Sequence, residues 1–128
     1  MNKKIIQTNA APAAIGAYSQ AVQHGDTLYV SGQIPLDPIS MELVSEDFDE
    51  QAKQVFKNIQ AIAEQAKTSL ENALKFTVYL TDFGDFAALN TVMAEFCPEP
   101  FPARAAVQVS ALPKDAKVEI DAVLCVSK

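Results

Sequence analysis

Apolar residues recur at intervals of three and four over one stretch in the middle of the sequence. They are Ala52, Val55, Phe56, Ile59, Ile62, Ala63 and Ala66. This spacing places them on one face of an α-helix, so we expect an amphipathic helix over 52–66 that buries this face against another element. The acidic run 46–50 comes just before it and suits the positive end of a helix dipole, which favours a helix start over a metal-binding role.

Strand-like stretches lie on both sides of this helix. We expect strands over 4–7, 18–23, 27–33, 74–80, 103–109 and 117–126, and a second amphipathic helix over 83–96 that ends before Pro98. Each helix lies between strands, as in crossovers that place both helices on the same sheet. The sequence therefore predicts an α+β fold, with a mixed six-stranded sheet and two helices on one face.

Length and charge narrow the classes of function. The chain has 128 residues without an internal repeat or linker, which predicts one domain over 1–128. Its net charge is −6 and its pI about 4.6, and nucleic-acid binding depends on cationic contacts, so we expect no nucleic-acid partner. No apolar stretch has the length of a membrane helix, and the N-terminus lacks the apolar region of a signal peptide. We therefore expect a cytoplasmic protein with no membrane partner and with reduced thiols.

The few histidine and cysteine residues exclude several kinds of site. With only His24, Cys97 and Cys125, and no CxxC pair, the sequence offers no zinc ligand set. Neither cysteine has a local activator, so we interpret both as small buried apolar groups. His24 stands beside an expected turn without a nucleophile elbow, so the pattern of a Ser-His-Asp site is missing.

Arg104 is the only arginine, against nine lysines, and it lies within an apolar expected strand. A guanidinium group binds a carboxylate through two parallel hydrogen bonds, which an ammonium group cannot do. The alternative is an edge-strand charge or an ion pair with an acidic residue, because structural ion pairs also use arginine. The residues alone leave both interpretations open.

Glu119 shares one face of the last expected strand with Lys117 and Asp121. This alternation is typical of a half-exposed strand and favours solvent exposure, although a carboxylate could also orient a water or exchange protons. In a simple hairpin of the last two strands, Arg104 would lie roughly 15 Å along the strand from the position opposite Glu119. A joint site therefore requires either another pairing of the strands or a second subunit.

Other polar positions have two interpretations each. The Ser31-Gly32 step, where we expect the strand to end, could present a hydroxyl and a bare backbone to a ligand, or it could simply form a bend. Tyr18 could form the wall of a site, but we favour a core position. Asn90 could contact a ligand, and a polar helix face also accounts for it.

Several segments together resemble the RidA (YjgF-type) reactive-intermediate deaminases over nearly the whole chain. They are 11–21 (APAAIGAYSQA), 30–35 (VSGQIP), 76–82 (FTVYLTD), 85–90 (DFAALN), 102–107 (PARAAV) and 112–120 (LPKDAKVEI). The last two are the most specific, and the order and spacing of all six carry the resemblance.

The resemblance implies a chorismate-mutase-like subunit and a homotrimer with clefts between subunits. It also implies hydrolysis of 2-imino acids, formed from enamines such as 2-aminoacrylate, to 2-keto acids and ammonia, without a cofactor. In the family, the residue matching Arg104 holds the substrate carboxylate, and the residue matching Glu119 is associated with the attacking water. Substrate-binding positions implied in the same way are Tyr18, Ser31, Gly32, Asn90, Ala105 and Ala106.

The sequence also departs from the family pattern, and a second function stays open. The departures are Ala17 (often Pro), Ala106 (often Cys), Met41 and Lys67 (often turn glycines), and Met93 (often aromatic). The alternative function is a non-catalytic trimer that binds small carboxylates, such as 2-keto acids, and acts through partner contacts or as a holdase. Ribonuclease activity and translation inhibition have been attached to relatives, but the acidic pI and single histidine weigh against them.

Overall fold

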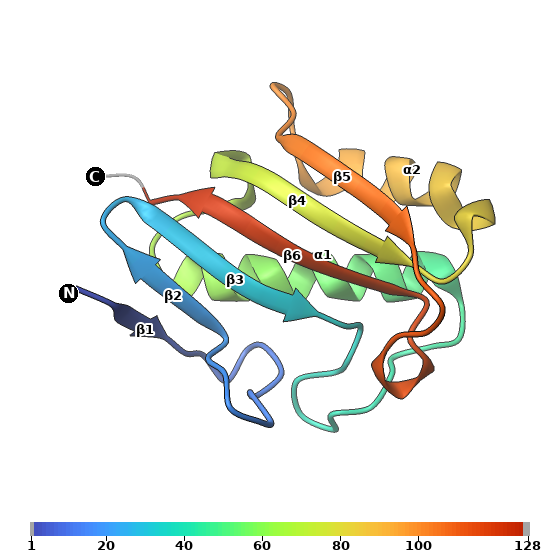
Figure 1. Ribbon diagram of the computed structural model, residues 1–128, viewed down its shortest axis with the longest axis horizontal. Coiled ribbons are helices and arrows are strands. Elements are labelled where there is room, and N and C mark those ends of the chain that lie inside the picture. The colour runs from blue at the N-terminus through green and yellow to red at the C-terminus, as the bar shows by residue number, and fades with distance from the viewer. Residues whose placement is uncertain (1, 127–128) are drawn as a thin grey trace.

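The computed structural model describes residues 2–126, which form a six-stranded sheet with two α-helices on one face (Figure 1). In sheet order the strands are β1 (Lys4–Ile6), β2 (Ala21–His24), β3 (Thr27–Gln33), β6 (Val118–Cys125), β4 (Ala73–Leu80) and β5 (Ala103–Gln108). The α-helices are α1 (Phe48–Gln65) and α2 (Phe86–Phe96), and the short 3-10 helices are η1 (Leu70–Asn72), η2 (Phe83–Asp85) and η3 (Pro113–Asp115). The expected fold class is confirmed.

The last strand of the chain lies in the middle of the sheet. β6 runs antiparallel to both β3 and β4, whereas β5 runs parallel to β4 at the outer edge. β4 therefore separates β5 from β6, and these two strands do not form a hairpin (Figure 1). The distance that the hairpin would have imposed between Arg104 and Glu119 does not apply.

Both helices begin where a polar side chain caps them or the turn before them. α1 begins at Phe48 because the side chain of Asp47 accepts a hydrogen bond from the backbone N–H of Glu50 at 3.1 Å. The expected place of the acidic run at the start of this helix is confirmed. α2 begins later than expected, since Asp82 instead caps η2. Within residues 2–126, neither helix is long and apolar enough to cross a lipid bilayer.

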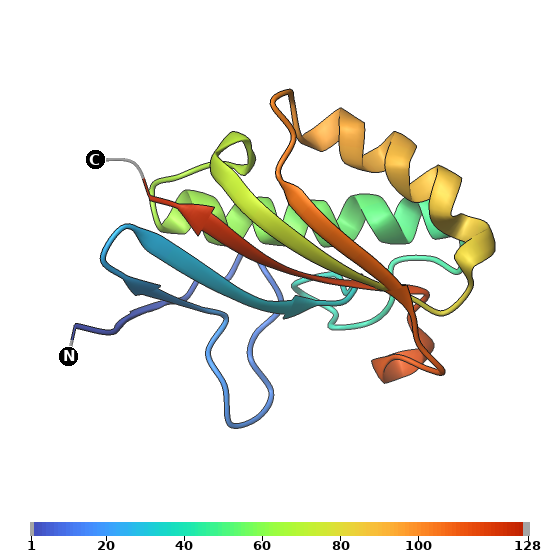
Figure 2. The same ribbon diagram turned by 45° about the horizontal axis from the view of Figure 1, so that its top comes forward.

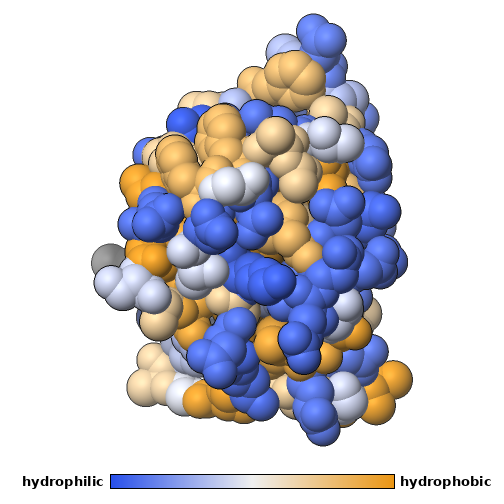
Figure 3. Space-filling view, turned by 90° about the vertical axis from the view of Figure 1, so that its right-hand side faces the viewer, coloured by the Kyte–Doolittle hydropathy of each residue, from blue (hydrophilic) through white to orange (hydrophobic). Residues whose placement is uncertain are grey.

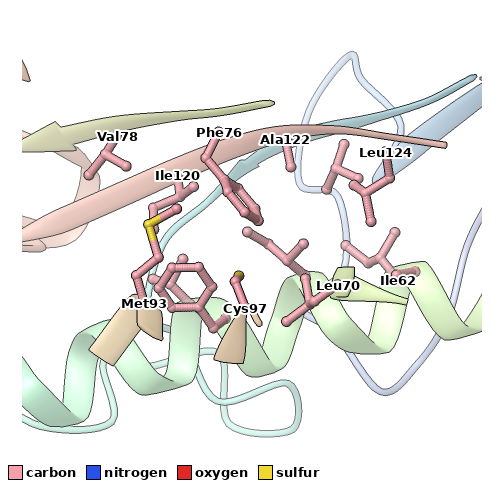
Figure 4. Close-up of a cluster of buried hydrophobic side chains, with 14 of the residues drawn as sticks. Ile62, Leu70, Phe76, Val78, Met93, Cys97, Ile120, Ala122 and Leu124 are labelled. Carbon is pink, nitrogen blue, oxygen red and sulfur yellow. The ribbon is translucent and has the colours of Figure 1, made fainter. Parts of the chain in front are cut away.

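The core lies between the sheet and the two helices, where side chains from β4, β6 and both helices meet (Figure 4). The apolar face from which this helix was predicted is buried here. The fully buried ring of Phe56 lies edge-on to Phe76 of β4, with centroids 5.7 Å apart, and stacks on Phe96 of α2, with centroids 5.4 Å apart. Phe56 therefore joins α1 to both the sheet and α2.

Two polar residues of α1 are also buried and hold neighbouring loops. Gln51 donates from Nε2 to the carbonyl of Ser45, and its Oε1 accepts from the backbone of Lys117 at 2.8 Å. Asn58 donates to the carbonyl of Leu36 at 3.1 Å. These side-chain amides satisfy backbone groups that the sheet leaves unpaired, so they fix the loops before α1 and before β6.

Gln20, which is 3% exposed, has the same role in the N-terminal loop. Its Nε2 donates to the carbonyls of Thr8, Ala11 and Pro12, and its Oε1 accepts from the backbone of Thr8 at 2.7 Å. The strand expected over 18–23 begins only at Ala21, because the preceding residues hold this loop instead of continuing the ladder with β1.

The C-terminal end of α1 predicts a stabilising substitution. Lys67 has a φ of 64°. Its backbone N–H donates to the carbonyl of Glu64, and the backbone N–H of Thr68 donates to the carbonyl of Ala63. This helix-ending motif favours glycine at the position of Lys67. We expect Lys67→Gly to raise the free energy of unfolding by about 1 kcal/mol, and Lys57→Gly, in the helix interior, to lower it by about 1 kcal/mol. Urea unfolding measures both, and a loss of stability in Lys67→Gly would contradict the prediction.

Candidate functional site

Arg104 lies on the outer edge of the sheet and faces α2. It is opposite Phe76 in the parallel ladder, so its side chain leaves the sheet on the helix-covered face. Its Nη1 donates to Asn90 Oδ1 at 2.5 Å and lies 3.9 Å from the sulfur of Met93. The guanidinium carbon lies 5.1 Å from the ring centre of Phe86. All these partners are neutral, so none of them compensates the guanidinium charge.

An open cavity of about 460 Å³ adjoins this guanidinium group. It is lined by Asn90, Met93, Ala94, Phe101, Pro102 and Arg104. The two polar groups can bind a carboxylate, while the remaining walls are apolar and suit a short carbon chain. Arg104 is thus on an edge strand, as one interpretation held, and no acidic residue of the described chain forms an ion pair with it. A small carboxylate matches this arrangement.

Glu119 lies on the other face of the sheet. Its neighbours Val118 and Ile120 are fully buried toward the helices, and Glu119 is opposite Tyr79 of β4. The expected alternation of a half-exposed strand is confirmed, and the side chain of Glu119 is half-buried instead of fully exposed to solvent. This burial raises the pKa of Glu119 above its ordinary value, and the carboxylate of Asp121 raises it further. A carboxyl group of this kind exchanges protons closer to neutral pH.

The carboxyl group of Glu119 lies against the backbone of Gly32. The pairing of β3 with β6 shifts between Val30 and Gln33, and this irregularity sets Gly32 apart from the regular ladder. A Cβ atom at Gly32 would overlap Oε2 of Glu119 and lie 3.0 Å from its carboxyl carbon. Glycine is therefore required for this approach. Both residues lie within β3, whose bounds match the expected strand over 27–33, so the alternative of a strand-ending bend at Ser31-Gly32 is wrong.

Ser31 and Tyr18 lie on the same side of the molecule as Gly32. The hydroxyl of Ser31 donates to the carbonyl of Ser19 at 2.6 Å, which ties β3 to the N-terminal loop. Tyr18 is 50% exposed, so its expected core position is wrong. Tyr18 and Gly32 line a small hollow of about 50 Å³. The structure thus brings Tyr18, Ser31, Gly32 and Glu119 into one neighbourhood.

Ala105 and Ala106 follow Arg104 along the edge strand. Ala105 is exposed and lies opposite Thr77, while Ala106 is partly buried, lies opposite Val78 and packs against the core. No described strand pairs with the outer edge of β5, so its outward backbone groups are available to a ligand or to another chain.

The expected site residues therefore form two groups on opposite faces of the sheet. Arg104 and Asn90 lie on the helix side, and Glu119 lies with Gly32 on the other. Figure 2 shows the helices on one side of the sheet and the N-terminal loop and η3 on the other. Across the sheet, Arg104 and Glu119 are two strand spacings apart, which is about 10 Å in total. Along the strands they are three residues apart, which adds a displacement of about 10 Å. One protomer does not bring both groups to one small ligand.

Sequence reasoning missed part of the group around Arg104. Phe86 and Met93, which contact Arg104, were not among the expected site residues. Their positions relative to Asn90, four residues before and three after, put all three on one helix face, and this signal could have found them. Cys97 behaves as expected, since burial raises its pKa to about 11 and keeps it a thiol, whereas Cys125 is only partly buried.

Comparison with known proteins identifies the family. The sequence model of the family described as Endoribonuclease L-PSP matches residues 8–126. A RutC family protein of Sinorhizobium fredii is 56% identical over 119 residues, which are 93% of this chain and 94% of the relative. The chain belongs to the RutC/RidA family. Another relative, named 2-iminobutanoate/2-iminopropanoate deaminase, from Bos taurus, is 49% identical over 121 residues, 94% of this chain and 88% of its own.

Solved structures agree with this assignment. RidA from an Antarctic Psychrobacter superposes with a TM-score of 0.93 at 56% identity, covering 96% of this chain and 99% of that one. TdcF of E. coli, solved with bound serine, gives a TM-score of 0.90 at 41% identity, covering 97% and 99%. The resemblance read from the sequence segments is thus confirmed at the level of family and fold.

The contact between Gly32 and Glu119 generates a prediction. In Gly32→Ala the new methyl group displaces the end of a flexible side chain, so we expect little loss of stability. The carboxyl group moves toward water, and the pKa of Glu119 falls toward its ordinary value. Carboxyl ¹³C NMR titration measures the pKa. Gly16→Ala is the control, because its Cβ meets the Tyr18 ring at an ordinary 3.5 Å. An unchanged pKa of Glu119 in Gly32→Ala would contradict the prediction.

Proposed function

We propose that this chain hydrolyses small 2-imino acids, such as 2-iminopropanoate formed from 2-aminoacrylate, to 2-keto acids and ammonia. The observation that carries the proposal is the single arginine, which faces an open cavity with neutral partners only. Such a guanidinium group suits the carboxylate that every 2-imino acid bears. The relatives named 2-iminobutanoate/2-iminopropanoate deaminase support this choice of substrate.

The proposed reaction requires little from the protein beyond the positioning of the substrate and of a water. Arg104 holds the carboxylate and so fixes C2 of the imine, which is electrophilic once its nitrogen is protonated. Glu119 orients a water and accepts a proton from it as the oxygen attacks C2. The resulting carbinolamine releases ammonia when the nitrogen is protonated and the carbonyl forms. The raised pKa of Glu119 supports this role, since the carboxyl group can take up and return a proton.

The separation of the two groups supports a site that spans two subunits. We propose a homotrimer in which Arg104 and Asn90 of one subunit meet Glu119 and Gly32 of the next. Exposed apolar side chains in β5 and next to β5 and α2, among them Phe83, Phe101 and Val107, offer surface for such a contact. In Figure 3 apolar residues gather over the upper part of this end of the molecule, on the side where β5 and α2 lie in Figure 1.

Removal of the guanidinium group tests the reaction directly. With 2-aminoacrylate generated in situ, we expect Arg104→Ala to lower kcat/KM for keto-acid formation more than 100-fold, or about 3 kcal/mol. Arg104→Lys should recover only part, because an ammonium group lacks the planar fork. Lys57→Ala, which removes a distant positive charge, is the control. The proposal fails if wild-type protein does not exceed buffer, and 2-ketobutyrate binding without turnover would then indicate the carboxylate-binding trimer.

Mixing two inactive variants tests the shared site. In a closed trimer built from Arg104→Ala and Glu119→Gln subunits, each mixed trimer has one boundary at which both residues are intact. Complete exchange of equal amounts should therefore restore about a quarter of wild-type activity. Unmixed variants are the controls, and sedimentation velocity checks the trimer. A mixture no more active than its components would place both residues in one subunit and overturn the arrangement.

A further inference from the structure

Two groups that the proposed reaction does not use lie next to Glu119 on the open face of the sheet. Asp121 is two residues further along β6, and the alternation of the strand puts both carboxyl groups on one face. Tyr79 is opposite Glu119 in the ladder, but its hydroxyl donates to Oδ2 of Asp121 at 3.2 Å. Tyr79 therefore holds the carboxylate of Asp121 and leaves that of Glu119 against Gly32.

This arrangement brings two like charges together where water screens them poorly. Two residues of a strand span about 7 Å, and both acidic side chains are half-buried. An ionised Asp121 disfavours ionisation of Glu119. The pKa of Tyr79 is itself raised, first by burial and then by Asp121 and Glu119, so its hydroxyl stays protonated and donates at neutral pH.

The other charged or titratable groups on this face do not replace Asp121. By strand alternation Lys117 lies on this face just before β6, while Lys75 and Tyr29 lie farther along β4 and β3, beside Val123. Tyr18 in the N-terminal loop and the charged residues Lys114 and Asp115 in η3 also lie on this side of the sheet, but the charge that raises the pKa of Glu119 is that of Asp121. β5 presents no charged residue to this face, only alanines and Val107, and both helices lie on the other one. Glu119 thus has one acidic neighbour on its own strand, and that neighbour is fixed by a hydrogen bond.

We propose that Asp121 is a positioning residue that acts through Glu119, and that its charge moves to higher pH the range in which Glu119 takes up and releases a proton. The proposal rests on the proposed function, in which Glu119 handles the water. It assigns to Asp121 an effect on the pH range of the reaction and no contact with substrate.

Two variants separate the charge of Asp121 from its hydrogen bond. Asp121→Asn removes the charge and keeps an oxygen that can accept from Tyr79, whereas Tyr79→Phe removes the hydrogen bond and keeps the charge. Glu64→Gln removes one exposed negative charge from α1, on the other side of the sheet, and is the matched control. Carboxyl ¹³C NMR, assigned with Glu119→Gln, follows the titration of Glu119 in each protein.

We expect the pKa of Glu119 to fall in Asp121→Asn and to stay raised in Tyr79→Phe and Glu64→Gln. The acid limb of kcat/KM should move to lower pH in Asp121→Asn alone. An unchanged pKa in Asp121→Asn, or an equal fall in Tyr79→Phe, would overturn the proposal. If Asp121→Asn does not fold, Asp121→Ser removes the same charge. The titration needs no turnover, so an inactive wild-type protein would refute the proposed function while the NMR result still decides the coupling.

Discussion

The insertion of β6 between β3 and β4 constrains everything that the candidate site can do. This last strand turns one side chain in two toward the helices, where Val118, Ile120, Ala122 and Leu124 close the core. The alternate side chains must then face the open side of the sheet, and Glu119 is among them. Because β4 intervenes between β6 and β5, Arg104 cannot join Glu119 within the protomer. The packing of the core thus supports the proposal that the site spans two subunits.

The two groups are also incomplete in electrostatic terms. Arg104 has a charge whose partners are an amide, a thioether and an aromatic ring. Glu119 is half-buried, with Asp121 as its nearest acidic neighbour on the strand. A negative charge would stabilise Arg104, and a positive charge or a proton would stabilise Glu119. A substrate that carries a carboxylate and an imine nitrogen supplies both. The polarity of the site therefore matches its proposed ligand at both ends.

Much of the fold could be predicted because apolar periodicity reports burial directly. The strand expected over 27–33 coincides with β3, and the apolar face of α1 is the buried one. Gln20, Gln51 and Asn58 were not predicted to be buried, since their burial depends on hydrogen bonds to loop carbonyl groups, which apolar periodicity does not report. The contact of the Glu119 carboxyl group with Gly32 was not predicted either, because it joins two strands that are far apart in the sequence. The roles of Arg104 and Glu119 came from family resemblance and stay predictions.

The contact between Gly32 and Glu119 also has an evolutionary consequence. The carboxyl group occupies the space that a side chain at position 32 would need, so the two positions cannot vary independently. A descendant that keeps the carboxyl group of the glutamate against this strand must keep the glycine, whereas one that has lost the glutamate is released from that restriction. Paired loss of both residues would therefore mark lineages in which this fold has abandoned the proposed chemistry for another use.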